Sequence, residues 1–286
     1  MKVLVIGSEG QLGLEFQKIS NSLDSLSWVF STIKTLDLIR LETISFFLNN
    51  INPSVIVNCA AYTNVDKAET ESKLANTINY KAVDIISKWT NENNKKLIHV
   101  STDYVFNGLS KLPLSENSIT NPVNEYGRSK LKGEQACFKN DPNSIVIRTS
   151  WLYSSFGKNF VKTMIDLMKN NNSVKVVNDQ IGSPTYAYDL TKVIIEIIMN
   201  SKNKSGLFHY SNEGEISWFE FARSIRELYN LDCEIIGVSS KEFKTLAKRP
   251  KYSLLNKSKI KKTFNLEIPN YKQSLENCIK VIKNEA

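Results

Sequence analysis

A glycine-rich turn between a short apolar strand and an amphipathic helix is the feature that most constrains how this chain can fold. Residues 3–6 are apolar and largely β-branched, and residues 14–19 place apolar side chains at helical spacing. Gly7, Gly10 and Gly13 lie between these two segments. Strand, glycine turn and helix in this order are the setting that a dinucleotide-binding turn requires, and an ordinary βα turn is the alternative.

Each glycine has its own task in a dinucleotide-binding turn. Gly7 permits the tight turn, Gly10 lets the backbone approach a pyrophosphate, and Gly13 lets the helix pack close to the strand. The pyrophosphate is expected to rest on the amide groups at the N-terminus of the helix. The spacing here is G-x-x-G-x-x-G, which differs from the more common G-x-G-x-x-G.

Strand-like and helical segments alternate along the rest of the chain, which is typical of a parallel sheet with crossover helices. We expect strands over residues 3–6, 27–30, 53–58, 96–100 and 144–148, and helices over 39–50, 76–91, 125–138 and 186–199. The pattern predicts an α/β fold, with a Rossmann-type doubly wound parallel sheet in residues 1–150. Residues 151–286 are expected to form mostly a smaller, mixed α/β substrate-binding lobe, with short strands and loops over 206–269 and some segments that return to the Rossmann core.

Composition excludes several classes of protein. A hydrophobic content of 41% with 23% charged residues is ordinary for a globular protein, and no apolar run is long enough to span a membrane. The cysteines, at positions 59, 137, 233 and 278, lack metal-site spacing, and no leader segment precedes the first strand, so we expect a cytoplasmic protein. The net charge of +8 comes from scattered lysines, which favours a solvated surface and an anionic ligand over nucleic acid.

A tyrosine and a lysine four residues apart give the second informative motif. Tyr126 and Lys130 share one face of the helix expected over residues 125–138. An ammonium group beside a phenol favours phenolate, so Lys130 is expected to lower the pKa of Tyr126. A tyrosine tuned in this way can exchange a proton with a carbonyl or alcohol oxygen. The pair is common by chance, but beside the glycine turn it predicts reduction of a ketone by a nicotinamide cofactor.

The carboxyl ends of the expected strands supply further candidate side chains. In an open parallel sheet these ends converge on one crevice, so we expect residues 58–63, 101–104 and 151–153 to meet the glycine turn there. Ser101 or Thr102 can orient a carbonyl oxygen, and a plain cap of the strand end is the alternative role for Thr102. Asp103 could bind a sugar hydroxyl or cap the next turn.

The residues at the end of the second strand indicate which nicotinamide cofactor the protein prefers. An acidic residue at its end would bind the 2′-hydroxyl of NAD, but Ser31, Thr32 and Lys34 stand there and no carboxylate follows until Asp37. This favours NADPH and leaves NADH open. The two histidines, at positions 99 and 209, lie in apolar segments and are expected to be core residues, and no hydrolase motif accompanies them.

With these residues in place, the chain resembles the extended short-chain dehydrogenase/reductase superfamily and, within it, the dTDP-4-dehydrorhamnose reductases. The resemblance covers nearly the whole chain. It rests on residues 7–13, 58–69, 101–106, 126–130, 148–153, 157–160, 179–185 and 249–250. The segments 65–69 and 179–185 are the most particular to this family.

The resemblance implies roles for individual residues. It implies that Thr102, Tyr126 and Lys130 form the catalytic set, and that Thr102, Asp103 and Trp151 contact a nucleotide sugar. It adds cofactor contacts beside the glycines and the Tyr126/Lys130 pair, namely Gln11, Leu12, Asp37, Leu38, Ala61, Tyr62 and Thr63. Two residues depart from the family pattern: Tyr62 stands where histidine is common, and Glu125 directly precedes Tyr126. Adjacent helical residues point about 100° apart, so Glu125 is expected to face away from the site.

The activity implied is NADPH-dependent reduction of the 4-keto group of dTDP-4-dehydro-L-rhamnose to dTDP-L-rhamnose, a step toward cell-surface polysaccharide. Two alternatives remain: a reductase or epimerase of another nucleotide deoxysugar, and a non-catalytic regulatory subunit of the methionine adenosyltransferase type. Some relatives dimerise through magnesium held by glutamates. Glu15 matches one such position, but no other ligand can be identified, so a homodimer and a magnesium site are left open.

Overall fold

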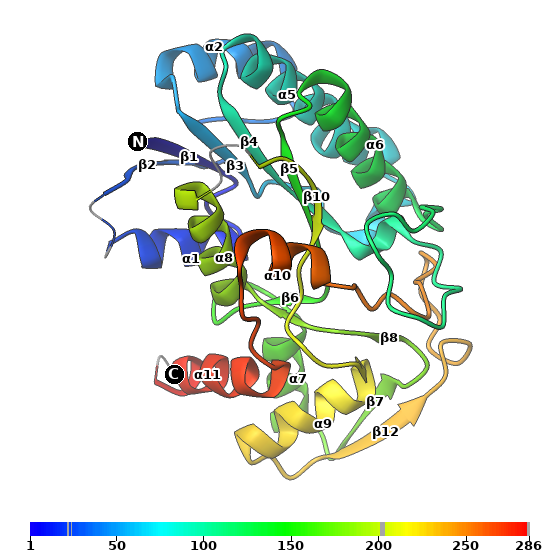
Figure 1. The fold of residues 1–286 in the computed structure, drawn as a ribbon. Helices are drawn as coiled ribbons and strands as arrows, with labels where there is room; N and C mark the ends of the chain where they lie inside the picture. Colours follow the sequence, from blue (N-terminus) through cyan, green and yellow to red (C-terminus); the bar gives the residue numbers. More distant parts are fainter. Residues whose placement is uncertain (22, 24, 201–203, 285–286) are drawn as a thin grey trace.

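The structure is a computed structural model that describes residues 1–21, 23, 25–200 and 204–284. Within this part of the chain, six strands form one parallel sheet in the order β10-β5-β4-β3-β1-β2 (Figure 1). The strands are β1 (Lys2–Ile6), β2 (Ser27–Ser31), β3 (Val55–Asn58), β4 (Lys96–Thr102), β5 (Ile145–Thr149) and β10 (Gly206–His209). The predicted α/β fold with a parallel Rossmann-type sheet is confirmed.

Helices cover both faces of this sheet because successive side chains of a strand point to opposite sides. From β1, Val3 and Val5 pack toward α1 (Gln11–Ser20), α8 (Ala187–Asn200) and α10 (Ser258–Phe264). Leu4 and Ile6 pack toward α2 (Leu41–Ile51) and α5 (Ala82–Glu92) on the other face, where α6 (Glu125–Asn140) lies against α5. All four strand residues are at most 1% exposed, as expected for a sheet that is buried on both faces.

Short elements connect the sheet to its surrounding helices. Between β3 and α5 lie α3 (Val65–Ala68), α4 (Ser72–Asn76) and a π-helical turn, η1 (Thr77–Lys81), and a 3₁₀ turn, η2 (Asp103–Val105), directly follows β4. The helix predicted over residues 76–91 is therefore present, but its first turn is π-helical and α4 precedes it. A π-helical turn often lies at a functional site, and this one packs against α6.

A second group of elements lies below the sheet in Figure 1 and has its own core. It contains α7 (Phe160–Asn170), α9 (Trp218–Tyr229) and α11 (Tyr271–Asn284). Its strands pair in twos: β7 (Ser173–Val177) with β12 (Glu234–Val238), β6 (Leu152–Tyr153) with β9 (Thr185–Tyr186), and β8 (Ile181–Gly182) with β11 (Ile216–Ser217). Tyr153, Phe221 and Leu275 are fully buried in this core.

The short strands expected over residues 206–269 are present as β10, β11 and β12, but the sequence-based prediction missed α9 and α10 in the same range. A capping box starts α9, in which the side chains of Ser217 and Glu220 bond each other's backbone N–H groups. The aromatic residues at the start of α9 are typical of strands, and they concealed the helical period.

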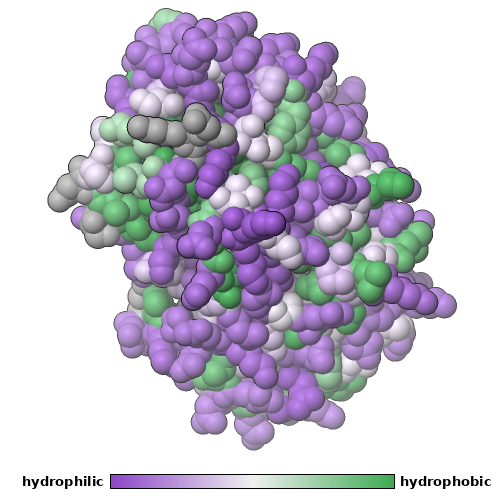
Figure 2. Space-filling view, viewed as in Figure 1, coloured by the Kyte–Doolittle hydropathy of each residue, from purple (hydrophilic) through white to green (hydrophobic). Residues whose placement is uncertain are grey.

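The chain returns to the sheet after residue 150. Here β10 pairs with β5, and α8 packs against α1. Among the described residues, no helix is long and apolar enough to cross a membrane, and hydrophilic residues cover most of the face seen in Figure 2.

Candidate active site

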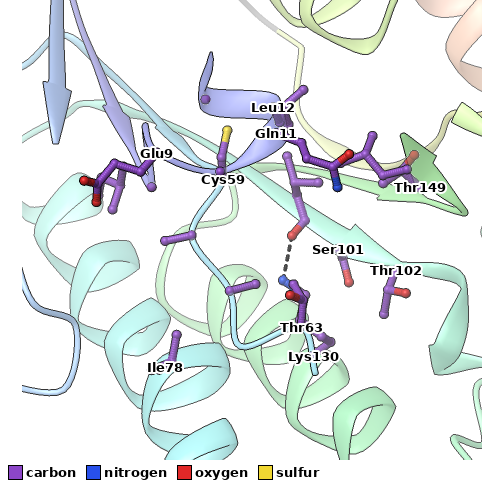
Figure 3. Close-up of a pocket in the computed structure, with 18 of the residues that line it drawn as sticks. Glu9, Gln11, Leu12, Cys59, Thr63, Ile78, Ser101, Thr102, Lys130 and Thr149 are labelled. Atoms are coloured by element: carbon purple, nitrogen blue, oxygen red, sulfur yellow. Dashed lines mark hydrogen bonds between the residues drawn. The ribbon is translucent and has the colours of Figure 1, made fainter. Parts of the chain in front are cut away.

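A cleft of about 590 Å³ opens at the carboxyl ends of the strands and brings most of the predicted site residues together (Figure 3). The predicted residues that line it are Gly7, Gly10, Gln11, Leu12, Gly13, Asp37, Leu38, Ala61, Thr63, Thr102, Asp103, Tyr126, Lys130 and Trp151. Tyr62 is not among the lining residues. Its hydroxyl donates to Glu71 at 2.6 Å and its backbone N–H donates to Asn79, so its side chain is held outside the cleft.

The glycine turn has two crowded positions and one open position. Gly7 has a φ of +82°, and a Cβ there would lie 2.6 Å from the backbone nitrogen of Ala60. A Cβ at Gly13 would lie 2.4 Å from the Cα of Ser8, whereas a Cβ at Gly10 would only touch the carbonyl of Gly7 at 3.4 Å. The open side of Gly10 faces the cleft, as one expects where a ligand approaches the backbone.

Gly10 is also the N-cap of α1, and no side chain caps that end of the helix. The N–H groups of the first turn of a helix carry a partial positive charge and lack partners within the helix. An uncapped helix end beside an open glycine therefore fits the pyrophosphate of a dinucleotide.

The end of the cleft near β2 is polar but not strongly basic. Asp37 accepts a hydrogen bond from the N–H of Ile39, so its carboxylate shapes its own loop. Glu9 lines the same end and accepts from the N–H of Ile33 at 3.3 Å (Figure 3). The sequence prediction did not include Glu9, because its position between two glycines gave no sign that its side chain reaches the loop after β2.

The catalytic candidates meet where α6 packs onto the end of β4. Asn124 caps α6 by accepting from the N–H of Gly127, and a Cβ at Gly127 would lie 2.2 Å from the carbonyl oxygen of Tyr104. This close approach places Tyr126 beside the end of β4, where it lines the cleft together with Thr102. Burial raises the pKa of Tyr126 to about 12, and the nearby hydroxyl of Thr102 opposes this shift.

Lys130 is 2% exposed and extends beneath β4. Its Nζ donates to the carbonyl of Val100 at 2.7 Å and lies 3.5 Å from Nε2 of His99. Burial lowers the pKa of Lys130 to about 8, although the charge of Glu134 opposes this. The prediction that Lys130 lowers the pKa of Tyr126 is wrong for this structure, because the amine is bound to a strand carbonyl and the phenol is desolvated.

The hydroxyl groups of Ser101 and Thr102 have different hydrogen-bond partners. The hydroxyl of Ser101 donates to Glu134 at 2.5 Å, whereas the hydroxyl of Thr102 donates to Asp103 at 3.1 Å beside Tyr126. Of these two residues, Thr102 is therefore the one whose hydroxyl can meet a substrate oxygen at Tyr126. Burial raises the pKa of Asp103 to about 6, and the nearby hydroxyls of Ser253 and Thr102 oppose this shift.

Trp151 forms the wall of the cleft after β5. Its φ of +47° is uncommon for a bulky residue and marks local backbone strain. The indole ring is stacked on that of Trp218 at the start of α9, with ring centroids 3.7 Å apart. Trp218 could not be predicted from sequence patterns, since the two indoles meet only through the tertiary fold.

The structure does not support a magnesium site at Glu15. A ligand shared between two subunits has to reach the surface, but Glu15 is 0% exposed and accepts a hydrogen bond from Ser154 at 2.6 Å. In the described ranges, no group of three or more histidine, cysteine, aspartate or glutamate side chains is arranged to hold a metal ion.

Comparison with known proteins agrees with this geometry. The family profile described as the RmlD substrate binding domain matches residues 1–284. The dTDP-4-dehydrorhamnose reductase of Aggregatibacter actinomycetemcomitans is 34% identical over 96% of this chain and 97% of its own length. The reductase of Salmonella typhimurium is 34% identical over 98% of this chain and 97% of its own length.

Two solved structures superpose closely. The dTDP-4-dehydrorhamnose reductase of Clostridium acetobutylicum has a TM-score of 0.94 and 36% identity, and the match covers 99% of this chain and 100% of that one. The reductase of Bacillus anthracis, in complex with NADP, has a TM-score of 0.92 and 37% identity, with coverage of 98% and 99%. The chain therefore belongs to the dTDP-4-dehydrorhamnose reductase family of oxidoreductases.

Proposed function

We propose that this protein reduces the 4-keto group of dTDP-4-dehydro-L-rhamnose with NADPH and forms dTDP-L-rhamnose. The observation that carries the proposal is that Thr102 and Tyr126 line one cleft together with the glycine turn. The pair offers two hydroxyl groups to one carbonyl oxygen, and the turn provides the place for a dinucleotide. Membership of the family supports the substrate class.

The residues of the cleft fit the cofactor. The open face at Gly10 and the uncapped start of α1 would hold the pyrophosphate, and residues 32–38 would hold the adenosine. Ala61, Thr63 and Lys130 also line the cleft and would bind toward the nicotinamide end. When bound, NADPH supplies the hydride. The Bacillus anthracis relative with NADP supports this cofactor.

Tyr126 acts as the proton donor in this proposal. With a pKa raised to about 12, its phenol keeps its proton at neutral pH and can give it to the carbonyl oxygen as negative charge develops there. The hydroxyl of Thr102 orients that oxygen and stabilises the charge. Asp103 and the stacked indole of Trp151 lie beside this pair and would contact the sugar.

The preference for NADPH over NADH belongs to the proposal too. Thr32 lines the cleft and suits a 2′-phosphate, and the exposed Lys34 follows it in the chain outside the lining. The carboxylate of Glu9 lies at the same end of the cleft and would repel the phosphate. A Glu9→Gln variant is therefore expected to favour NADPH more strongly than the natural protein does.

The deciding experiment is incubation of the purified protein with dTDP-4-dehydro-L-rhamnose and either cofactor, followed by product identification by NMR. We expect dTDP-L-rhamnose and stoichiometric oxidation of NADPH. A panel of dTDP-, GDP- and UDP-4-keto sugars tests the alternative deoxysugar reductase or epimerase. If none of the sugars in the panel supports NADPH oxidation, the result would instead favour a non-catalytic regulatory subunit.

We also propose a cytoplasmic location, which the free thiols of all four cysteines support. The homodimer remains a prediction, and sedimentation equilibrium with and without magnesium would test it.

A further inference from the structure

A buried histidine that has no part in the proposed reaction touches the lysine of the site. His99 lies in β4, is 0% exposed and faces α6. Its Nε2 lies 3.5 Å from Nζ of Lys130, and its Nδ1 lies 3.2 Å from the side-chain amide nitrogen of Asn58 at the end of β3. Each ring nitrogen therefore has one polar neighbour.

A backbone group fixes the orientation of the Asn58 amide. The N–H of Ala60 donates to Oδ1 of Asn58 at 3.2 Å. A backbone N–H can only donate, so the oxygen of the Asn58 side chain must face Ala60 and its NH₂ group must face His99. In the opposite orientation, the NH₂ group of Asn58 would face the N–H of Ala60, and both groups are donors.

This orientation decides where the imidazole carries its proton. The NH₂ group of Asn58 is a donor, so Nδ1 of His99 must accept and the proton of the neutral ring must lie on Nε2. Burial, with the charge of Lys130 adding to it, holds the pKa of His99 well below its usual range, so the ring is neutral near pH 7. The Nε2–H group is then directed at the amine of Lys130.

An N–H donor directed at an amine favours the amine without its charge. A neutral amine accepts from Nε2–H through its lone pair, whereas an ammonium group has only donors to offer. The other titratable groups near this amine are Glu134 and Cys137 on α6 and Cys59 after β3. Glu134 favours the charged amine, so His99 opposes it from the strand side.

We propose that Asn58 locks His99 in the Nε2–H tautomer, and that His99 thereby acts as a positioning residue that makes the proton of Lys130 easy to lose. Each reduction consumes the phenol proton of Tyr126. A proton from solvent restores the phenol. Lys130, when it loses its own proton, becomes a neutral amine that accepts from Nε2–H of His99. Proton number balances, with one proton taken from water in each turnover.

The tautomer can be read without any turnover, in the full chain labelled with ¹⁵N-histidine. The sequence has two histidines, and the structure assigns them opposite tautomers. Nδ1 of His209 donates to the carbonyl of Leu114 at 3.0 Å, and its Nε2 lies 3.4 Å from Nη1 of Arg148, which can only donate. His209 is therefore the internal reference for the Nδ1–H form, and a His209→Gln variant assigns the signals.

Long-range ¹H–¹⁵N spectra near neutral pH should show one Nε2–H and one Nδ1–H ring, with the Nε2–H ring belonging to His99. A His99 ring that is protonated on Nδ1, or on both nitrogens, would overturn the proposal. The inference rests on the proposed role of Lys130, but this spectrum does not depend on activity. A protein that lacks reductase activity and still shows the Nε2–H ring would refute the function and leave the tautomer lock in place.

Kinetics test the consequence for Lys130. In Asn58→Asp a carboxylate accepts both from Ala60 and from Nδ1–H, so the ring changes tautomer and Nε2 accepts from the ammonium of Lys130. The alkaline limb of the kcat profile should then move to higher pH by about one unit. The control is the same substitution in a His99→Leu background, which retains the added charge but lacks the ring. A shift of equal size in that background would overturn the role of His99, and a much smaller one supports it.

Discussion

The guanidinium of Arg148 holds the carboxylate of Glu134 at two points inside the protein, with Nε–Oε1 at 2.9 Å and Nη2–Oε2 at 2.6 Å. The two side chains are 4% and 3% exposed, and Ser101 donates to the same carboxylate. Ser101 directly precedes Thr102, and Glu134 lies one helical turn after Lys130. The ion pair therefore joins α6, β4 and β5 beneath the candidate catalytic residues.

Glu134→Gln should lower the free energy of unfolding by about 3–5 kcal/mol, because it leaves the charge of Arg148 buried without a counter-ion. Urea unfolding measures this loss. The control is Glu125→Gln, since Glu125 pairs with Arg128 at 2.7 Å on the surface, with 29% and 41% of the side chains exposed. That pair should contribute less than about 1 kcal/mol. Equal losses in the two variants would show that burial does not set the strength of the Glu134 pair.

The sequence was sufficient to predict the sheet and the crevice, because both follow from local patterns. Residues 3–19 carry the strand, turn and helix in one stretch, and strand alternation with helices places the strand ends at one edge. Glu125 also behaves as expected, since it pairs with Arg128 rather than facing the cleft.

What the sequence did not predict depends on contacts between distant segments. Glu134 and Arg148 look like ordinary helix and strand residues until the fold buries them together. The same holds for Trp218 beneath Trp151, and for Lys130, whose spacing from Tyr126 indicated a shared helical face but not that its amine binds Val100.

Two glycines of the turn should respond differently to alanine. Gly13→Ala places a Cβ 2.4 Å from the Cα of Ser8, so α1 must shift and stability should fall by about 1–3 kcal/mol. Gly10→Ala meets only ordinary contact at 3.4 Å, so stability should change by about 1 kcal/mol or less. Its methyl group fills the proposed pyrophosphate position, so NADPH affinity should fall about tenfold or more. Fluorescence titration measures the effect on NADPH affinity, and urea unfolding measures the effect on stability. Normal NADPH binding by Gly10→Ala would contradict the proposed pyrophosphate site at Gly10.

Lys130→Met should stabilise the protein at pH 7 while it removes activity. The pKa of Lys130 is about 8 in the folded protein against a usual 10.5, so the unfolded chain binds more protons between these values. The natural protein therefore gains stability as pH rises from 8 to 10.5, and the cost of burying the charge is fully present below pH 8. At pH 7 the variant should gain about 1–3 kcal/mol, after allowance for the lost bond to Val100.

Urea unfolding at pH 7 and pH 10 tests this prediction, because the advantage of Lys130→Met should shrink at the higher pH. Lys88→Met is the control, since Lys88 is exposed and pairs with Asp84 at 2.7 Å. Loss of that ion pair should lower the stability of Lys88→Met at pH 7 by less than about 1 kcal/mol. A gain in both variants would indicate a general effect of methionine rather than relief of a buried charge.

Tyr126→Phe should lower turnover by about 10²–10⁴-fold and leave NADPH affinity nearly unchanged, since it removes the proton donor but retains the ring. Tyr104→Phe is the matched control, because its ring packs edge-on against that of Tyr126 with centroids 5.5 Å apart. It should lose much less activity. Steady-state kinetics with the 4-keto sugar decide the matter, and near-normal turnover by Tyr126→Phe would exclude this tyrosine as the acid.

Trp218→Leu should weaken binding of the sugar nucleotide without changing the affinity for the cofactor. Trp151 has a φ of +47°, and its indole is stacked on that of Trp218 with ring centroids 3.7 Å apart. Removal of the Trp218 indole therefore allows the Trp151 indole to leave the wall of the cleft. The KM for the sugar should rise about tenfold, as expected for the loss of a stacking contact worth about 1.4 kcal/mol, while NADPH affinity stays the same. Trp28→Leu is the control, because Trp28 stacks on Phe30 in β2 and is not among the residues that line the cleft. It should lower stability and leave the KM unchanged, so an equal rise in KM for both variants would contradict a specific support of Trp151 by Trp218.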